Sequence, residues 1–67
     1  MINLFINGQQ RQFSATLSIT QLLQELDLTG KRVAIELNGE IVPRSAHAVV
    51  TLSDADHLEI VVAVGGG

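Results

Sequence analysis

The chain has 67 residues, 46% of them hydrophobic, and its four Lys or Arg and seven Asp or Glu give a formal net charge of −3. A core of this size buries only about 60% of the surface that the unfolded chain exposes. We therefore expect one modest domain with no room for an interior catalytic cavity, which disfavours most enzymes. The absence of cysteine excludes a disulfide scaffold, a thiolate nucleophile and cysteine-ligated metal sites.

Charge and hydropathy narrow the choice of partners. Mild acidity and only two aromatic residues argue against nucleic-acid binding. The first residues lack the basic region of a signal peptide, and the longest apolar run, 60–64, is far shorter than the roughly 20 residues of a membrane span. We expect an unprocessed cytoplasmic monomer that binds no membrane.

The first 14 residues predict a β-hairpin. Apolar residues alternate with Asn3 and Phe5 over 2–6, which is the period of a half-buried strand. Asn7-Gly8 is a strong signal for a type I′ turn, and residues 9–14 can return as the second strand. The two strands should pair antiparallel.

A helix should begin after Ser18. Its hydroxyl can cap the N–H of Gln21 while the Gln21 side chain reaches back, and Leu17 is placed to contact Leu22 across the cap. The following apolar positions have the spacing of one helical stripe, at Ile19, Leu22, Leu23 and Leu26. We expect Gly30 to end the helix.

The second half of the chain predicts three further strands. Residues 33–37 alternate, Asn38-Gly39 repeats the hairpin signal, and 40–42 forms a short return strand that Pro43 closes. Residues 45–48 indicate a helical turn followed by an extended piece over 49–52. After a turn at 53–56, alternation from His57 to Val64 predicts the last strand.

One helix is too few to cover both faces of a sheet, so this order of elements predicts an α+β fold. If the first and last strands lie side by side at the sheet centre, they run parallel and the helix packs across them. That arrangement is the ubiquitin-like β-grasp, with a mixed sheet of four to five strands and one main helix on one face. Ferredoxin-like folds need two helices and are disfavoured.

Catalytic groups are sparse. His47 and His57 have no third ligand at metal-like spacing, so we interpret both as exposed or half-exposed and expect no metal site. Asp54 and Asp56 flank a turn, where carboxylates usually accept hydrogen bonds from backbone amides. The serines suit caps and turns, and no His–acid pair activates any of them.

The chain ends in Gly65, Gly66 and Gly67, which we expect to form a flexible tail on a domain of residues 1–64. A frayed end and a remnant of cloning are alternatives that composition leaves open. The functional interpretation rests on the missing Cβ atoms. Three glycines extend about 10 Å, can thread a channel too narrow for side chains, and would deliver the Gly67 carboxylate to the active site of another protein.

A partner-binding patch is a further prediction. Phe5, Val61 and Ala63 fall on the strand phase opposite the helix, where a one-helix sheet is open to solvent. The alternative is that Phe5 packs beneath residues 44–52.

Several segments together resemble a known family. The run from Glu36 to Arg44, the turn Asp54-Ala55-Asp56 and the ending Val64-Gly65-Gly66-Gly67 are similar to those of the ThiS family, the sulfur carrier proteins of thiamine biosynthesis. The likeness covers essentially the whole chain. It implies a β-grasp protein that serves as a substrate and is not itself an enzyme.

The resemblance also implies partners. An adenylyltransferase (ThiF) would use ATP and magnesium to adenylate Gly67, and sulfur supplied through a cysteine desulfurase would convert the adenylate to a thiocarboxylate. Thiazole synthase (ThiG) would then take the sulfur, and the carrier would hold no cofactor stably. A carrier of the molybdopterin-synthase type and a ubiquitin-like covalent modifier are the alternatives.

Two positions depart from the family pattern. Relatives often carry an aromatic residue near His47, which leaves the packing of the segment after Arg44 open. Relatives often have Asp-Gly-Asp at the acidic turn, so we expect Ala55 to adopt a turn without positive φ.

Overall fold

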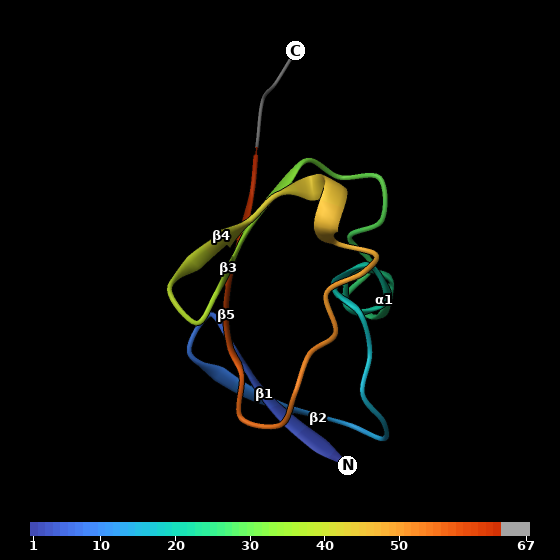
Figure 1. The fold of residues 1–67 in the computed structure, drawn as a ribbon, viewed down its shortest axis with the longest axis vertical. Helices are drawn as coiled ribbons and strands as arrows, with labels where there is room; N and C mark the ends of the chain where they lie inside the picture. The colour runs from blue at the N-terminus through green and yellow to red at the C-terminus, as the bar shows by residue number, and fades with distance from the viewer. Residues whose placement is uncertain (64–67) are drawn as a thin grey trace.

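Seven elements make up the computed structural model, which describes residues 1–63 (Figure 1). They are β1 (Ile2–Ile6), β2 (Gln9–Phe13), α1 (Ile19–Glu25), β3 (Val33–Leu37), β4 (Glu40–Val42), the 3-10 helix η1 (Arg44–Ala46) and β5 (His57–Val62). The five strands form one sheet in the order β2-β1-β5-β3-β4, with β5 parallel to β1 and antiparallel to β3. The predicted ubiquitin-like β-grasp fold is confirmed.

Both hairpins turn as the sequence predicts. Asn7 and Gly8 have φ of 51° and 82°, and Asn38 and Gly39 have φ of 49° and 88°. Positive φ at both central residues is the mark of a type I′ turn, whose twist matches that of the flanking strands. The return strand β2 ends at Phe13, one residue earlier than expected.

The start of α1 is also confirmed. The Gln21 N–H donates to Ser18 Oγ at 3.1 Å, and the Ser18 N–H donates to Gln21 Oε1 at 2.8 Å. Leu17 and Leu22 on either side of this capping box are both buried in the core. The helix therefore begins where a reciprocal cap and an apolar contact coincide.

The predicted helix end at Gly30 is wrong. The chain leaves the helix at Asp27, which has a φ of 59° and whose N–H donates to the Gln24 carbonyl at 3.1 Å. The Leu28 N–H donates to the Leu23 carbonyl at 2.8 Å, which completes a Schellman motif. Because Leu28 then packs against the core, burial ends the helix before the glycine is reached.

The segment between β4 and β5 differs in detail from the prediction. The helical turn is η1, one residue earlier than expected, and the predicted extended piece makes only a single bridge, between Ser18 and Thr51. The Leu52 N–H donates to the Leu17 carbonyl at 2.9 Å, and the Leu52 side chain is buried. This segment packs against the start of α1, so it forms no strand of the sheet.

His47 is buried, with 6% of its surface exposed, so the expectation of an exposed or half-exposed ring is wrong. Its Nε2 lies 3.3 Å from the Val42 carbonyl oxygen, and its own carbonyl accepts a hydrogen bond from the Thr20 N–H at 3.0 Å. The ring thus fills the junction between η1 and the first turn of α1. There it lines a pocket of about 210 Å³ together with Lys31 and Arg44.

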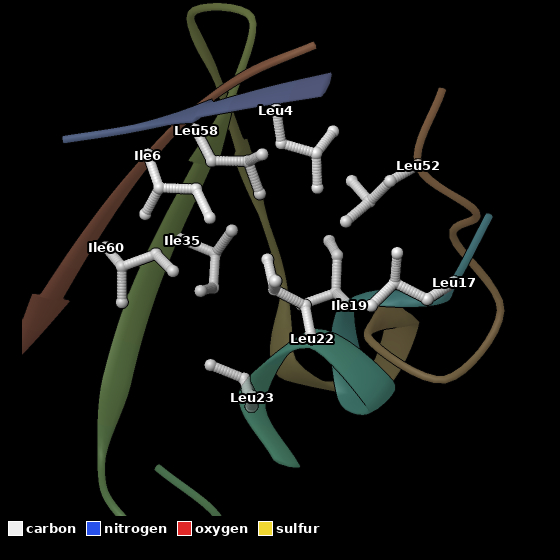
Figure 2. Close-up of a cluster of buried hydrophobic side chains, with 10 residues drawn as sticks. All are labelled: Leu4, Ile6, Leu17, Ile19, Leu22, Leu23, Ile35, Leu52, Leu58 and Ile60. Atoms are coloured by element: carbon white, nitrogen blue, oxygen red, sulfur yellow. The ribbon is translucent and has the colours of Figure 1, made fainter. Parts of the chain in front are cut away.

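The core lies between the sheet and α1, as Figure 2 shows. Strand side chains point at the helix, and the segments on either side of α1 close the edges of this layer. Its members are Leu4, Ile6, Leu17, Ile19, Leu22, Leu23, Ile35, Leu52, Leu58 and Ile60. Leu58 and Ile60 come from β5, so the strand that leads to the carboxyl end is anchored in the centre of the core.

Ala55 adopts a φ of 70°, so the expected turn without positive φ is wrong. The conformation is imposed by hydrogen bonds around the turn. The Asn3 N–H donates to Asp54 Oδ1 at 2.6 Å, the Ala55 N–H donates to the Asn3 carbonyl at 2.7 Å, and the Ser53 N–H donates to Asp56 Oδ2 at 2.8 Å. These bonds offset the steric cost of a Cβ in the left-handed region.

Ala55→Gly is therefore expected to stabilise the domain by about 0.5–1 kcal/mol, because the steric relief exceeds the added freedom of the unfolded chain. Urea denaturation measures the effect. Ala34→Gly, the same change in the middle of β3, serves as control and should destabilise by about 0.5–1 kcal/mol. Equal losses at both positions would contradict the interpretation of strain at Ala55.

Candidate functional site at the end of β5

The candidate site is the carboxyl end of β5, which leads to the terminal glycines. The predicted reactive residue Gly67 and the predicted tail residues Gly65 and Gly66 lie outside the described residues. The structure does show what holds the strand that precedes them.

On one side, β5 pairs with β3 almost to the end of the described chain. The antiparallel register runs from Leu37 opposite Leu58 to Val33 opposite Val62. One residue further, the Ala63 N–H donates to the Arg32 carbonyl at 2.9 Å. The backbone is therefore fixed up to Ala63.

On the other side, β5 is held by β1 and by one side chain. The parallel pairing covers only Phe5 with His57 and Ile6 with Leu58. Beyond it, the Ile60 N–H donates to Asn7 Oδ1 at 2.7 Å, and Asn7 Nδ2 donates to the Ile60 carbonyl at 3.0 Å. The side-chain amide acts as one more peptide group of β1, although the main chain has already turned away.

The second turn asparagine holds the start of β5. The His57 N–H donates to Asn38 Oδ1 at 2.9 Å, and Asn38 Nδ2 donates to Asp56 Oδ1 at 3.0 Å. Both asparagines thus serve two purposes: they adopt positive φ and they bond β5. Sequence reasoning assigned them only to turns. The sequence feature that could have indicated this second role is the presence of asparagine where aspartate would also suit the turn. An amide side chain both donates and accepts hydrogen bonds, whereas a carboxylate only accepts them.

Asn7→Gly is expected to cost about 1–3 kcal/mol, because it keeps the turn conformation and leaves the Ile60 peptide groups without partners. Urea denaturation and amide exchange at Ile60 measure the effect. Asp27→Gly is the matched control, since Asp27 also has positive φ but makes no side-chain bond to β5 among the described residues. A loss of stability no larger than that of the control would contradict the role of the Asn7 amide.

Phe5, Val61 and Ala63, the residues of the predicted patch, lie in the strand phase that faces away from α1, with Phe5 half-buried. Phe5 stacks on His57 with ring centroids 4.6 Å apart and an interplanar angle of 15°. Because segment 44–52 packs on the helix side, Phe5 does not lie beneath it. Val61 lies opposite Ala34 of β3, two residue pairs beyond Glu59 and Glu36, and Ala63 is exposed.

The structure therefore groups Val61 with residues that sequence reasoning missed. Ile41 of β4 lies opposite Glu36, on the same outward face, and has 69% of its surface exposed against 61% for Val61. The sequence could have indicated this position, because Ile41 directly precedes Val42 in a strand and adjacent side chains point to opposite faces. Val42 is half-buried, so Ile41 faces outward. Glu36 and Glu59 lie directly opposite each other, in the same row across the sheet as Ile41. Acidic and apolar side chains are therefore neighbours on this face.

The two aspartates of the acidic turn have structural roles. Asp54 and Asp56 accept hydrogen bonds from backbone or side-chain N–H groups, as predicted. Across residues 1–63, no three His, Cys, Asp or Glu side chains lie close enough to hold a metal ion. In the same range no helix has the length and apolar character needed to cross a bilayer.

Comparison with known proteins identifies the family. The ThiS family model matches residues 4–67. The sulfur carrier protein ThiS of Bacillus subtilis is 38% identical over 63 residues, which cover 92% of this chain and 96% of that protein. A thiazole synthase of Paramagnetospirillum magneticum is 48% identical over 66 residues, or 98% of this chain, but the chain spans only 20% of its length.

A solved structure agrees. The crystal structure of the thiamine biosynthesis protein ThiS from Geobacter metallireducens has a TM-score of 0.83 and 35% identity, covering 98% of this chain and 100% of that one. The match to the family model and the similarity to the solved structure lead to the same conclusion: the chain belongs to the ThiS family.

Proposed function

We propose that this chain is a cytoplasmic sulfur carrier whose Gly67 carboxylate is converted to a thiocarboxylate for thiazole formation in thiamine biosynthesis. The observation that carries the proposal is the family match, which extends through Gly67. The Bacillus subtilis relative, 96% of which this match covers, is named a sulfur carrier protein. The structure of β5 supports it, because hydrogen bonds to β3 and to Arg32 fix the strand up to Ala63.

The chemistry begins with activation by a partner adenylyltransferase (ThiF). An oxygen of the Gly67 carboxylate attacks the α-phosphorus of ATP and releases pyrophosphate, with Mg²⁺ held by the partner. The acyl-adenylate has a good leaving group, so a persulfide sulfur, derived from cysteine through a desulfurase, displaces AMP. A second thiol then cleaves the sulfur–sulfur bond and leaves the thiocarboxylate. In this scheme the carrier is a substrate and the partner is the enzyme.

The chain's own contribution is presentation of its end. The backbone is hydrogen-bonded up to Ala63, and four residues, 64–67, follow it. Four extended residues reach about 13 Å, and glycines at the last three positions fit a channel that would exclude side chains. Because the backbone is fixed up to Ala63 and the last three residues have no side chains, the carboxylate can take only a limited set of positions in the partner's active site.

Thiazole synthase (ThiG) is the proposed acceptor of the sulfur. In Paramagnetospirillum magneticum, a protein named thiazole synthase contains a segment 48% identical to this chain, and that segment is one fifth of its length. A carrier segment joined to the enzyme in one polypeptide supports a direct transfer between the two, since tethering raises the effective concentration of the reacting groups.

Activation in vitro tests the proposal. The chain is incubated with the adenylyltransferase, ATP, Mg²⁺ and a persulfide donor, and its intact mass is measured. We expect the mass change of one oxygen replaced by sulfur. An unchanged mass under conditions that activate the ThiS protein of Bacillus subtilis would overturn the proposal.

Genetic and conjugate analysis separate the alternatives. Loss of the gene should create a requirement for the thiazole precursor, whereas a molybdopterin-type carrier would produce a defect in molybdoenzymes. A ubiquitin-like modifier would instead leave isopeptide-linked conjugates in cell extracts. Conjugates without free thiocarboxylate would contradict the carrier function.

A further inference from the structure

Strand β5 has a free hydrogen-bonding edge just before the terminal segment. Along β5, peptide groups alternate between the two neighbouring strands. The Ala63 N–H bonds Arg32 on the β3 side, whereas both peptide groups of Ile60 bond Asn7 on the β1 side. Val62 has the same phase as Ile60, so its N–H and C=O point to the β1 side.

No strand lies on the β1 side of Val62 within residues 1–63. Strand β1 ends at Ile6, and the chain turns at Asn7-Gly8 into β2, which lies on the far side of β1. The Asn7 amide reaches Ile60 and no further along β5. An unpaired strand edge of this kind accepts an added strand.

A groove borders this edge. It has a volume of about 250 Å³ and lies between the carboxyl half of β5, the first hairpin and the residues that follow α1. Its apolar lining comprises Ile6, Leu26, Leu28, Ile60 and Val62. Arg11 is its one charged lining residue, beside the polar Asn7 and Gln9. Main-chain bonding groups and an apolar pocket with one cation therefore occur together.

We propose that an extended segment of the activating enzyme pairs with Val62 in the sheet position that β1 leaves vacant, with an apolar side chain in this groove and a carboxylate beside Arg11. Strand addition of this kind takes affinity from main-chain bonds and specificity from side-chain pockets. The inference rests on the proposed function. If Gly67 reacts in the partner's active site, only about 13 Å of chain separates it from Ala63, so the partner must cover the end of β5.

Amide hydrogen exchange of the ¹⁵N-labelled chain tests the pairing directly. In the free chain, the Val61 amide, which faces β3, should be protected and the Val62 amide should exchange rapidly. With the enzyme bound, protection at Val62 should rise by about tenfold or more. Protection of Val62 in the free chain that increases with its concentration would mean pairing between copies of the chain and would overturn the inference.

Failure of the inference differs from failure of the function. Thiocarboxylate formation with Val62 unprotected in the complex would overturn strand addition and leave the carrier function standing. Absence of both binding and thiocarboxylate would overturn both.

Substitution at Val62 provides the second test. Val62→Pro removes the N–H that faces the open edge and also replaces the branched side chain, and proline is tolerated at such positions. Val62→Ala trims the side chain and keeps the N–H, so it is the matched control. We expect the proline variant to bind the enzyme about tenfold more weakly than the alanine variant. Equal affinities, with the amide of Leu58 still protected in both, would contradict the pairing.

Discussion

Gly66→Val is expected to abolish thiocarboxylate formation while leaving the domain folded. The substitution adds a branched side chain to a segment that must pass through a narrow channel in the proposed mechanism. Since even a 1 Å misplacement of reacting groups costs about 10²-fold in rate, a blocked tail should give no detectable product. The thermal midpoint of the variant should match that of the parent, because no core residue changes.

The measurement is intact mass after activation, with thermal unfolding monitored in parallel. Ala48→Val is the control, because it creates the same branched side chain at an exposed position outside the terminal segment. It should be activated normally. A Gly66→Val chain that forms thiocarboxylate at the parental rate would contradict the threading of the tail.

Leu58→Ala is expected to remove a large share of the stability of the domain. Leu58 is only 2% exposed and lies on β5 between β1 and β3, facing the helix. A buried Leu→Ala change costs about 2–5 kcal/mol. A domain of this length has a total stability of only about 3–10 kcal/mol, so the loss is a large share of it.

Urea denaturation followed by circular dichroism measures this effect. Val61→Ala is the control on the same strand, since its side chain is largely exposed and the change should stay within about 0.5 kcal/mol. Similar losses at Leu58 and Val61 would contradict the placement of the core on the helix face of the sheet.

Much of the fold could be predicted because local signals agree with tertiary structure. The Asn-Gly pairs at both hairpins demand positive φ at two successive residues, and few other turns satisfy that demand. The Ser18–Gln21 capping box is likewise a local pattern, complete within four residues. Strand alternation then places the core residues on one face.

Other features could not be predicted because they depend on contacts between distant segments. The helix stops at Asp27 because Leu28 packs into the core, which local glycine preference does not reveal. Ala55 is held at positive φ by bonds to Asn3, 52 residues earlier in the chain. His47 is buried because η1 folds against α1.

In the candidate site, too, some features could be predicted from local sequence and others depend on contacts between distant segments. The terminal glycines and the outward phase of Val61 are visible in the sequence. The reach of the Asn7 amide to Ile60 depends on the register of β1 beside β5, and that register follows from the complete sheet. The stacking of Phe5 on His57 also depends on how β1 and β5 lie side by side in the complete sheet. The position of Ile41 on the same face as Val61 depends on the pairing of β3 with both β4 and β5.

The most direct test of the carrier function is mass spectrometry of the chain purified from its native host grown without thiamine. Intact mass followed by backbone fragmentation locates any replacement of oxygen by sulfur. The carrier function predicts a fraction of molecules with one sulfur in place of one oxygen at the carboxyl group of Gly67. Sulfur at any other residue, or only the unmodified carboxylate while the cells make thiazole, would contradict it.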